Sequence, residues 1–158
     1  MSLSLSLSLS LLLLLLVALA HAEVINFHTC AGTEEQCSID EIRVDPCPQA
    51  LENLACRIRR RRPAHMSFKF TPKFDAEKLE ASLNWVKSEA ELLPLVTLEK
   101  DACKSTSCPV KAGVQHTYAI QVPIESKFPV STYTIRWALQ DPVSSKRCCF
   151  NMDIKVVR

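Results

Sequence analysis

Eight cysteines are the residues of this 158-residue chain with the most evident chemistry. No two of them form a CxxC pair, so their spacing does not indicate a zinc site. An even number of cysteines in an exported chain is typical of a disulfide framework, although the count alone does not define the connectivity. We therefore expect four disulfides among Cys30, Cys37, Cys47, Cys56, Cys103, Cys108, Cys148 and Cys149.

The other chemistry-bearing residues form no catalytic pattern. His28, His65 and His116 are too scattered to match the spacing of metal ligands. The chain has only two glycines, Gly32 and Gly113, so it lacks the glycine-rich turns of nucleophile elbows and phosphate-binding loops. The sequence therefore predicts a binding protein rather than an enzyme, with no metal site and no cofactor.

The first 22 residues, "MSLSLSLSLSLLLLLLVALAHA", carry no charged side chain and end in small residues. This pattern predicts a secretory signal peptide at residues 1–22. A membrane anchor is the alternative, but the run is barely long enough to span a bilayer. Residues 23–158 are then one domain with a core of its own, and its location is extracellular or, as the alternative, the lysosomal lumen.

A basic stretch, "CRIRRRRP" at residues 56–63, contains Arg57, Arg59, Arg60, Arg61 and Arg62. Such runs can be nuclear or nucleic-acid-binding addresses, or protease processing sites. Export from the cell excludes a nucleic-acid partner, and Pro63 disfavours cleavage before it. The stretch is therefore interpreted either as a solvated turn or as a turn that attracts anionic membranes, at ~1 kcal/mol per charge near the surface.

Several segments alternate apolar and polar residues with the period of two that half-buried strands show. They lie at residues 39–44, 64–70, 118–122, 133–140 and 150–156. Their apolar faces comprise Ile42, Val44, Ala64, Met66, Phe68, Phe70, Tyr118, Ile120, Val122, Tyr133, Ile135, Trp137, Leu139, Phe150, Met152, Ile154 and Val156. Prolines occur between these segments, where strands end.

Residues 75–91 allow two interpretations. Leu79, Leu83 and Val86 recur at helical spacing, whereas the stretch from Leu79 to Trp85 alternates strictly, as a strand does. A helix would separate Trp85 from the leucines, so we expect a strand. With about six to eight strands and no convincing helix, the chain is predicted to be an all-β antiparallel sandwich. Periodicity alone does not say whether the two inner faces touch or enclose a cavity.

The surroundings of the cysteines resemble the Niemann-Pick type C2 proteins of the ML lipid-recognition family, which also includes the group 2 mite allergens. The stretches that carry the resemblance are "DPCP", "DACKSTSCPV", "VPIESKFPV" and "WALQD". The resemblance spans essentially all of residues 23–158. It implies an immunoglobulin-like β-sandwich of two antiparallel sheets with an internal apolar pocket for a sterol or a fatty-acid-like lipid.

The resemblance also implies a disulfide pattern. It pairs Cys47 with Cys56 and Cys103 with Cys108, and it pairs Cys30 with a cysteine of the last strand. Cys149 matches that partner better than Cys148, because an aromatic residue follows it. The two extra cysteines, Cys37 and Cys148, are then expected to pair with each other. Neighbouring strand residues face opposite sides, so Cys148 and Cys149 can reach different partners.

Family pocket positions can be carried over where the motifs match. Four of them are expected on loops around the mouth of the pocket, namely Leu93, Leu95, Phe128 and Pro129. Walls are expected from Val44, Met66, Trp137 and Phe150, and the remaining positions are Ile124 and Tyr133. In the same frame Ile58 points inward. Arg61 stands where the family often has glycine, so the expected hairpin should avoid a positive φ or be wider than usual.

Taken with the signal peptide, these features predict a secreted, monomeric protein that binds and transfers one sterol or fatty-acid-like lipid. The alternative is an innate-immune accessory protein that recognises microbial lipid and docks on a receptor. A disulfide-stapled protein without a ligand is the third hypothesis.

Overall fold

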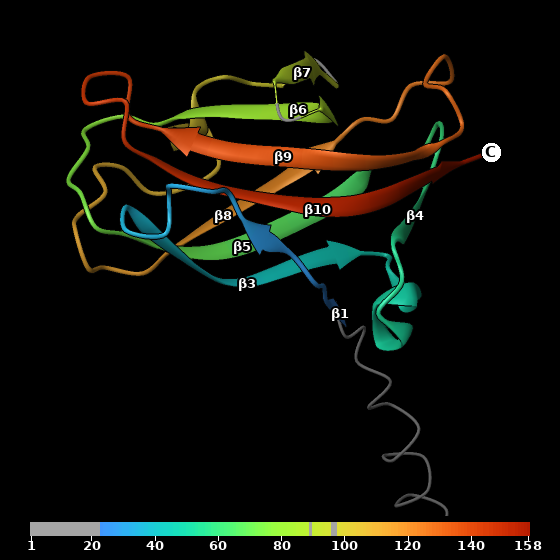
Figure 1. Ribbon diagram of the computed structural model, residues 1–158, viewed down its shortest axis with the longest axis horizontal. Coiled ribbons are helices and arrows are strands. Elements are labelled where there is room, and N and C mark those ends of the chain that lie inside the picture. Colours follow the sequence, from blue (N-terminus) through green and yellow to red (C-terminus); the bar gives the residue numbers. More distant parts are fainter. Residues whose placement is uncertain (1–22, 89, 96–97) are drawn as a thin grey trace, which may run out of the picture.

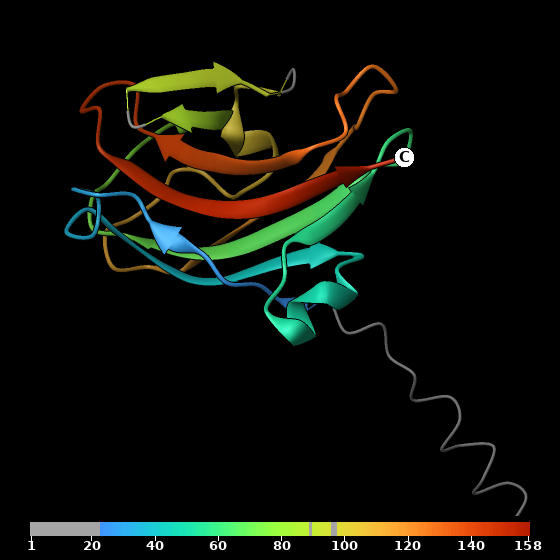
Figure 2. The same cartoon turned by 45° about the vertical axis from the view of Figure 1, so that its right-hand side comes forward.

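The computed structural model describes residues 23–88, 90–95 and 98–158, so the expected signal peptide lies outside the described residues. The described chain folds into two facing β-sheets (Figures 1 and 2). This confirms the predicted all-β sandwich. Among the described residues, no helix has the length and apolar character needed to cross a membrane.

One layer is a four-stranded antiparallel sheet in the order β1-β3-β5-β8. Its strands are β1 (Glu23–Val24), β3 (Cys37–Asp45), β5 (Ala64–Pro72) and β8 (His116–Val122). Strands β3 and β5 alternate buried apolar residues with polar residues that are half-buried or exposed, as the sequence predicts, because one face of each packs on the other sheet.

The other layer is a six-stranded sheet in the order β2-β10-β9-β6-β7, with β4 also paired to β10. Its strands are β2 (His28–Thr29), β4 (Cys56–Arg59), β6 (Glu80–Ser88), β7 (Glu91–Pro94), β9 (Thr132–Gln140) and β10 (Arg147–Val157). Strand β2 pairs with β10 at Phe150 and Asn151, and β4 runs parallel to β10 from Ile154 onwards.

Residues 80–88 form strand β6, which confirms the choice of strand over helix in the ambiguous region. Leu79, Ala81 and Leu83 are buried on one face, and Trp85 is half-buried on the same face. The described helical turns are two short 3-10 segments, η1 (Pro48–Glu52) and η2 (Ala102–Lys104).

The arginine-rich connection differs from the prediction in two ways. Strands β4 and β5 belong to different sheets, so the segment between them crosses the sandwich rather than closing a hairpin. Arg61 also adopts a φ of 63°, so the first of the two predicted alternatives, avoidance of a positive φ rather than a wider turn, is wrong. Backbone bonds hold it there: Arg60 N donates to Val157 O at 3.0 Å, and Arg61 N donates to Ile124 O at 2.7 Å. These tertiary contacts override the preference for glycine.

Four disulfides fasten the sandwich, and their pairs are those that the resemblance implied: Cys30–Cys149, Cys37–Cys148, Cys47–Cys56 and Cys103–Cys108. Cys37–Cys148 joins β3 to β10, and therefore one sheet to the other, inside the main core. Cys30–Cys149 packs with Ala138 in a separate small cluster. The neighbouring residues Cys148 and Cys149 of β10 therefore form their disulfides on opposite faces of the six-stranded sheet.

Candidate functional site

A small apolar cavity of about 40 Å³ lies between the two sheets. No polar surface contributes to its wall. The residues that line it are Val44, Ile58, Ala64, Met66, Leu83, Leu95, Val122, Ile124, Ile135, Met152 and Ile154. Four of the positions predicted for lipid binding are among them: Val44, Met66, Leu95 and Ile124.

Strand register brings these side chains together. Val44 of β3 is paired with Met66 of β5 in the four-stranded sheet. Met152 of β10 is paired with Ile135 of β9 in the six-stranded sheet. Both pairs point inward because their strands alternate between buried and exposed positions. The cavity is therefore framed by one cross-strand pair from each sheet.

The other lining residues were not predicted as site residues, although the sequence contained a signal for them. Ala64, Ile135, Met152 and Ile154 all belong to apolar faces predicted from the period of two. That signal marks a side chain as inward-facing, but it does not separate a cavity wall from a filled core. Only the three-dimensional arrangement makes that distinction.

Two predicted wall residues, Trp137 and Phe150, do not line the cavity. They are almost fully buried in an aromatic cluster with Phe68 and Tyr118. The ring centroids of Phe68 and Phe150 are 5.0 Å apart, and those of Tyr118 and Trp137 are 5.7 Å apart. These rings fill one half of the sandwich along the strands, and the cavity occupies the other, aliphatic half.

Two of the four predicted mouth residues, Leu95 and Phe128, line a surface groove of about 470 Å³, and Leu93 and Pro129 do not. Leu95 borders both this groove and the interior cavity. Tyr133 donates a hydrogen bond to Pro129 O at 2.9 Å, and its ring lies 5.5 Å from that of Phe128. Burial raises the pKa of the Tyr133 hydroxyl, so it stays protonated and can keep this bond.

Leu93 lies outside the cavity on β7, where it pairs with Trp85 and is 37% exposed. Trp85 packs edge-on against Tyr133, with the ring centroids 5.4 Å apart. Leu93, Trp85, Tyr133 and Phe128 thus connect β7 to the loop that carries Pro129. The region predicted as a mouth is a continuous aromatic and aliphatic rim beside the groove.

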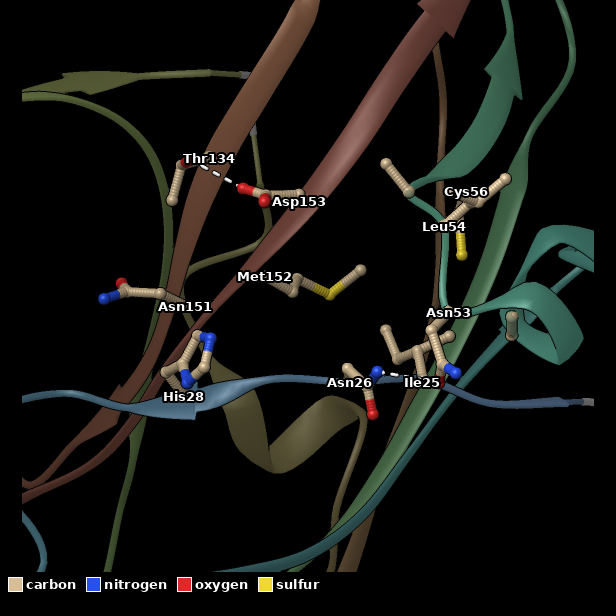
Figure 3. A pocket seen from close by; sticks show the side chains of 12 residues that line it. Ile25, Asn26, His28, Asn53, Leu54, Cys56, Thr134, Asn151, Met152 and Asp153 are labelled. Atoms are coloured by element: carbon tan, nitrogen blue, oxygen red, sulfur yellow. Dashed lines mark hydrogen bonds between the residues drawn. The ribbon is translucent and has the colours of Figure 1, made fainter.

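A second surface pocket, of about 300 Å³, differs from the interior cavity because polar and apolar residues both line it (Figure 3). Asn26 Nδ2 donates to Asn53 Oδ1 at 2.9 Å on one side of it, and Thr134 Oγ1 donates to Asp153 Oδ1 at 2.6 Å on the other. Met152 borders both this pocket and the cavity. Its amides and carboxylate do not suit an apolar ligand.

The interior cavity can hold hydrocarbon but offers no group for covalent chemistry. Pockets for drug-sized ligands typically measure ~300 to 1,000 Å³. A lipid therefore requires the walls to move apart from their present separation. Among the described residues, no three His, Cys, Asp or Glu side chains gather as a metal site would require.

Comparison with known proteins agrees with this geometry. The ML domain family matches residues 24–156. The chain is 32% identical over 139 residues to the MD-2-related lipid-recognition protein of Manduca sexta, covering 87% of this chain and 88% of that protein. It is 33% identical over 107 residues to the mite group 2 allergen Tyr p 2 of Tyrophagus putrescentiae, covering 66% of this chain and 70% of the allergen.

A solved structure gives the same result for the fold. The crystal structure of a Niemann-Pick type C2 protein from the Japanese carpenter ant superposes with a TM-score of 0.73 at 25% identity. That match covers 84% of this chain and 100% of the ant protein, so the sandwich is the immunoglobulin-like ML fold. The chain therefore belongs to the ML-domain family of lipid-recognition proteins.

Proposed function

We propose that this protein is a secreted, monomeric carrier that holds one sterol or fatty-acid-like lipid between its two sheets and transfers it between membranes. The observation that supports this most directly is the interior cavity, whose lining is entirely apolar and is shared between both sheets. No enzymatic step is needed, because loading and release require only the transfer of apolar surface out of and into water or membrane.

The driving force is burial of the lipid, at ~25 cal/mol per Å² of apolar surface. A lipid of ~20 to 28 heavy atoms at ~0.3 kcal/mol per atom would bind with a dissociation constant on the order of micromolar to tens of micromolar. An apolar wall recognises length and shape rather than chemical identity. Sterols and fatty acids are therefore both candidate cargoes.

The sandwich is constructed so that the cavity end can open. Cys37–Cys148 ties the sheets where β3 and β10 begin. The cavity lies farther along both strands, at Val44 of β3 and at Met152 and Ile154 of β10. Cys47–Cys56 ties the loop that follows β3 to the first residue of β4, whereas no described disulfide joins β5 or β8 to the other sheet. Ligand entry is proposed to separate the sheets there, between Leu95 and Phe128.

Transfer requires contact with membranes, and the arginines of residues 57–62 are proposed to supply it. Arg57, Arg59, Arg61 and Arg62 are exposed, so they can approach an anionic surface. Each charge close to such a surface contributes ~1 kcal/mol of attraction. Binding to anionic vesicles should therefore weaken as salt increases.

The test is to extract and identify the lipid that co-purifies with the secreted protein, and then to displace it with a sterol or with oleate. The proposal predicts one lipid per protein and displacement by at least one of the two competitors. Protein that carries no lipid and binds neither competitor would refute the carrier function.

A second candidate is an innate-immune accessory function. The relative named as an MD-2-related lipid-recognition protein favours it, as do Leu92 and Leu93, which are 38% and 37% exposed beside the rim. Exposed leucines at a mouth can dock on a receptor once lipid is bound. Lipid-dependent association with a receptor ectodomain, lost in Leu92→Ser/Leu93→Ser, would distinguish this function from simple transport.

A further inference from the structure

Strands β4 and β10 finish at the same end of the sandwich (Figure 1). A surface pocket of about 670 Å³ lies at that end. It shares two lining residues with the apolar cavity and none with the pocket of Figure 3. The residues that line it are Pro46, Pro48, Gln49, Arg57, Ile58, Arg59, Arg62, Pro63, Ala64, Val157 and Arg158. Four of them are arginines and none is an aspartate or a glutamate.

Strand geometry explains why several arginines line one pocket. Arg57 and Arg59 are two residues apart on β4, so both point to the exposed side while Ile58 is buried between them. Arg62 reaches the same pocket from the connection that follows β4. In the part of the chain that the structure describes, none of these three arginines forms an ion pair.

The frame of the pocket is fixed by bonds that leave these side chains available. Arg57 N donates to Gln49 Oε1 at 3.2 Å, and Gln49 itself lines the pocket. Cys47–Cys56 ties η1 to the start of β4. Arg60 instead stabilises the surrounding loops, because its Nη1 donates to Ser126 O at 2.8 Å.

From this arrangement we infer that the pocket binds a phosphomonoester. A carboxylate offers two oxygens and a single negative charge, which balances only one of the several positive charges that line the pocket. A phosphomonoester offers three terminal oxygens and about −1.5 to −2 charges, and guanidinium binds it through paired hydrogen bonds. The geometry therefore favours this group over a general attraction to negative surfaces.

The phosphomonoester has two sources: a lipid headgroup, such as that of phosphatidic acid, or a soluble phosphate ester. Ile58 and Ala64 line both this pocket and the interior cavity, so a headgroup here would lie just outside the apolar wall. The site does not depend on the carrier function, because its donors are all outside the cavity.

The experiment compares three ligands on the full mature protein. Vesicles of phosphatidylcholine contain either phosphatidic acid or phosphatidylserine, adjusted to equal surface potential, and glycerophosphate is titrated alone by calorimetry. Arg57→Gln/Arg59→Gln removes two pocket charges, and Arg57→Lys/Arg59→Lys keeps the charge but loses the planar fork. Lys78→Gln/Lys146→Gln is the matched control, since both lysines are exposed and outside the pocket. Unchanged thermal unfolding confirms that each variant is folded.

We expect phosphatidic acid vesicles to bind at least ~10-fold more tightly than phosphatidylserine vesicles, and both arginine variants to lose that preference while the lysine control keeps it. Competition by glycerophosphate would identify a soluble ester as a sufficient ligand, and its absence would identify the lipid headgroup as the source. Equal binding of the two vesicles, or a preference that survives in Arg57→Gln/Arg59→Gln, would overturn the inference. A matching loss in Lys78→Gln/Lys146→Gln would do the same, because it would show general charge attraction.

Discussion

Asp141 is a buried carboxylate that organises the loop between β9 and β10. It accepts hydrogen bonds from Val143 N at 3.1 Å, from Ser144 N at 3.0 Å and from the Ser144 hydroxyl. These bonds, with that of the Ser144 side chain foremost, lower the pKa of Asp141 below its ordinary value. The loop is thus held by the charged form of one residue.

Asp141→Asn is expected to lower the free energy of unfolding at neutral pH, because it removes the charge that these donors stabilise. A lowered folded pKa stabilises the protein above the unfolded pKa of about 3.9, and this stabilisation is lost as the pH falls through the folded pKa. The stability difference between wild type and Asp141→Asn, measured by urea unfolding, should therefore be constant from pH 7 to pH 5 and shrink below about pH 4. A difference independent of pH down to pH 2 would contradict this account.

The fluorescence of the two tryptophans should respond differently to lipid entry. Trp85 is half-buried at the rim and packs against Tyr133, whereas Trp137 is 1% exposed inside the aromatic cluster. In Trp137→Phe, where Trp85 alone emits, addition of oleate should shift the fluorescence maximum to shorter wavelength, because the rim loses water. In Trp85→Phe the maximum should stay within a few nanometres. The opposite pattern would place the ligand in the aromatic half.

At the scale of elements, β10 connects the most parts of the molecule, since it pairs with β2, β4 and β9 and carries two cysteines. Cys30–Cys149 and Cys37–Cys148 close almost the same long loop, with sequence separations of 119 and 111 residues. While one of them remains, the other closes only a short additional ring through residues 30–37. Their contributions to stability therefore cannot be independent.

Replacing either pair by serine should cost about 3 kcal/mol, and removing the second pair should cost about 5 kcal/mol more, in the chain-entropy estimate. A double-mutant cycle of urea unfolding on Cys30→Ser/Cys149→Ser, Cys37→Ser/Cys148→Ser and the combined variant measures this coupling. Additive costs would show that native strain or residual unfolded structure, rather than loop closure, governs these bonds.

Much of the fold could be predicted at this scale, because alternation is a local signal. The strict pattern from Leu79 to Trp85 was sufficient to predict β6 against a competing helical spacing. The link between β4 and β5 could not be predicted in the same way. The partner of β4 is β10, almost a hundred positions away, and the positive φ of Arg61 depends on bonds to Val157 and Ile124 around it.

The candidate site was predictable to a lesser extent. Val44 and Met66 line the cavity as expected, but Trp137 and Phe150, which also face inward, pack into the aromatic cluster. Whether a side chain points inward follows from its place in the alternation of the strand. Whether it then lines a cavity or fills the core depends on packing against side chains that are distant in the sequence. Sequence periodicity therefore predicts the inward direction of a side chain but not its packing.

For the whole molecule, the central claim is that a lipid occupies the aliphatic half of the sandwich, while the aromatic half and Cys37–Cys148 hold the sheets together. Val44→Phe places a larger side chain in the cavity, and Val110→Phe makes the same enlargement in the buried core outside it. Each should cost about 1 to 3 kcal/mol of stability through overpacking. Only the first should obstruct a ligand.

The most direct test is therefore the dissociation constant of a fluorescent sterol or fatty acid, measured on wild type, Val44→Phe and Val110→Phe and normalised to folded protein. We predict one bound lipid per wild-type chain, affinity at least ~10-fold weaker in Val44→Phe and near wild type in Val110→Phe. Equal affinity in Val44→Phe and wild type, with Val44→Phe folded, would show that the lipid does not lie between the sheets.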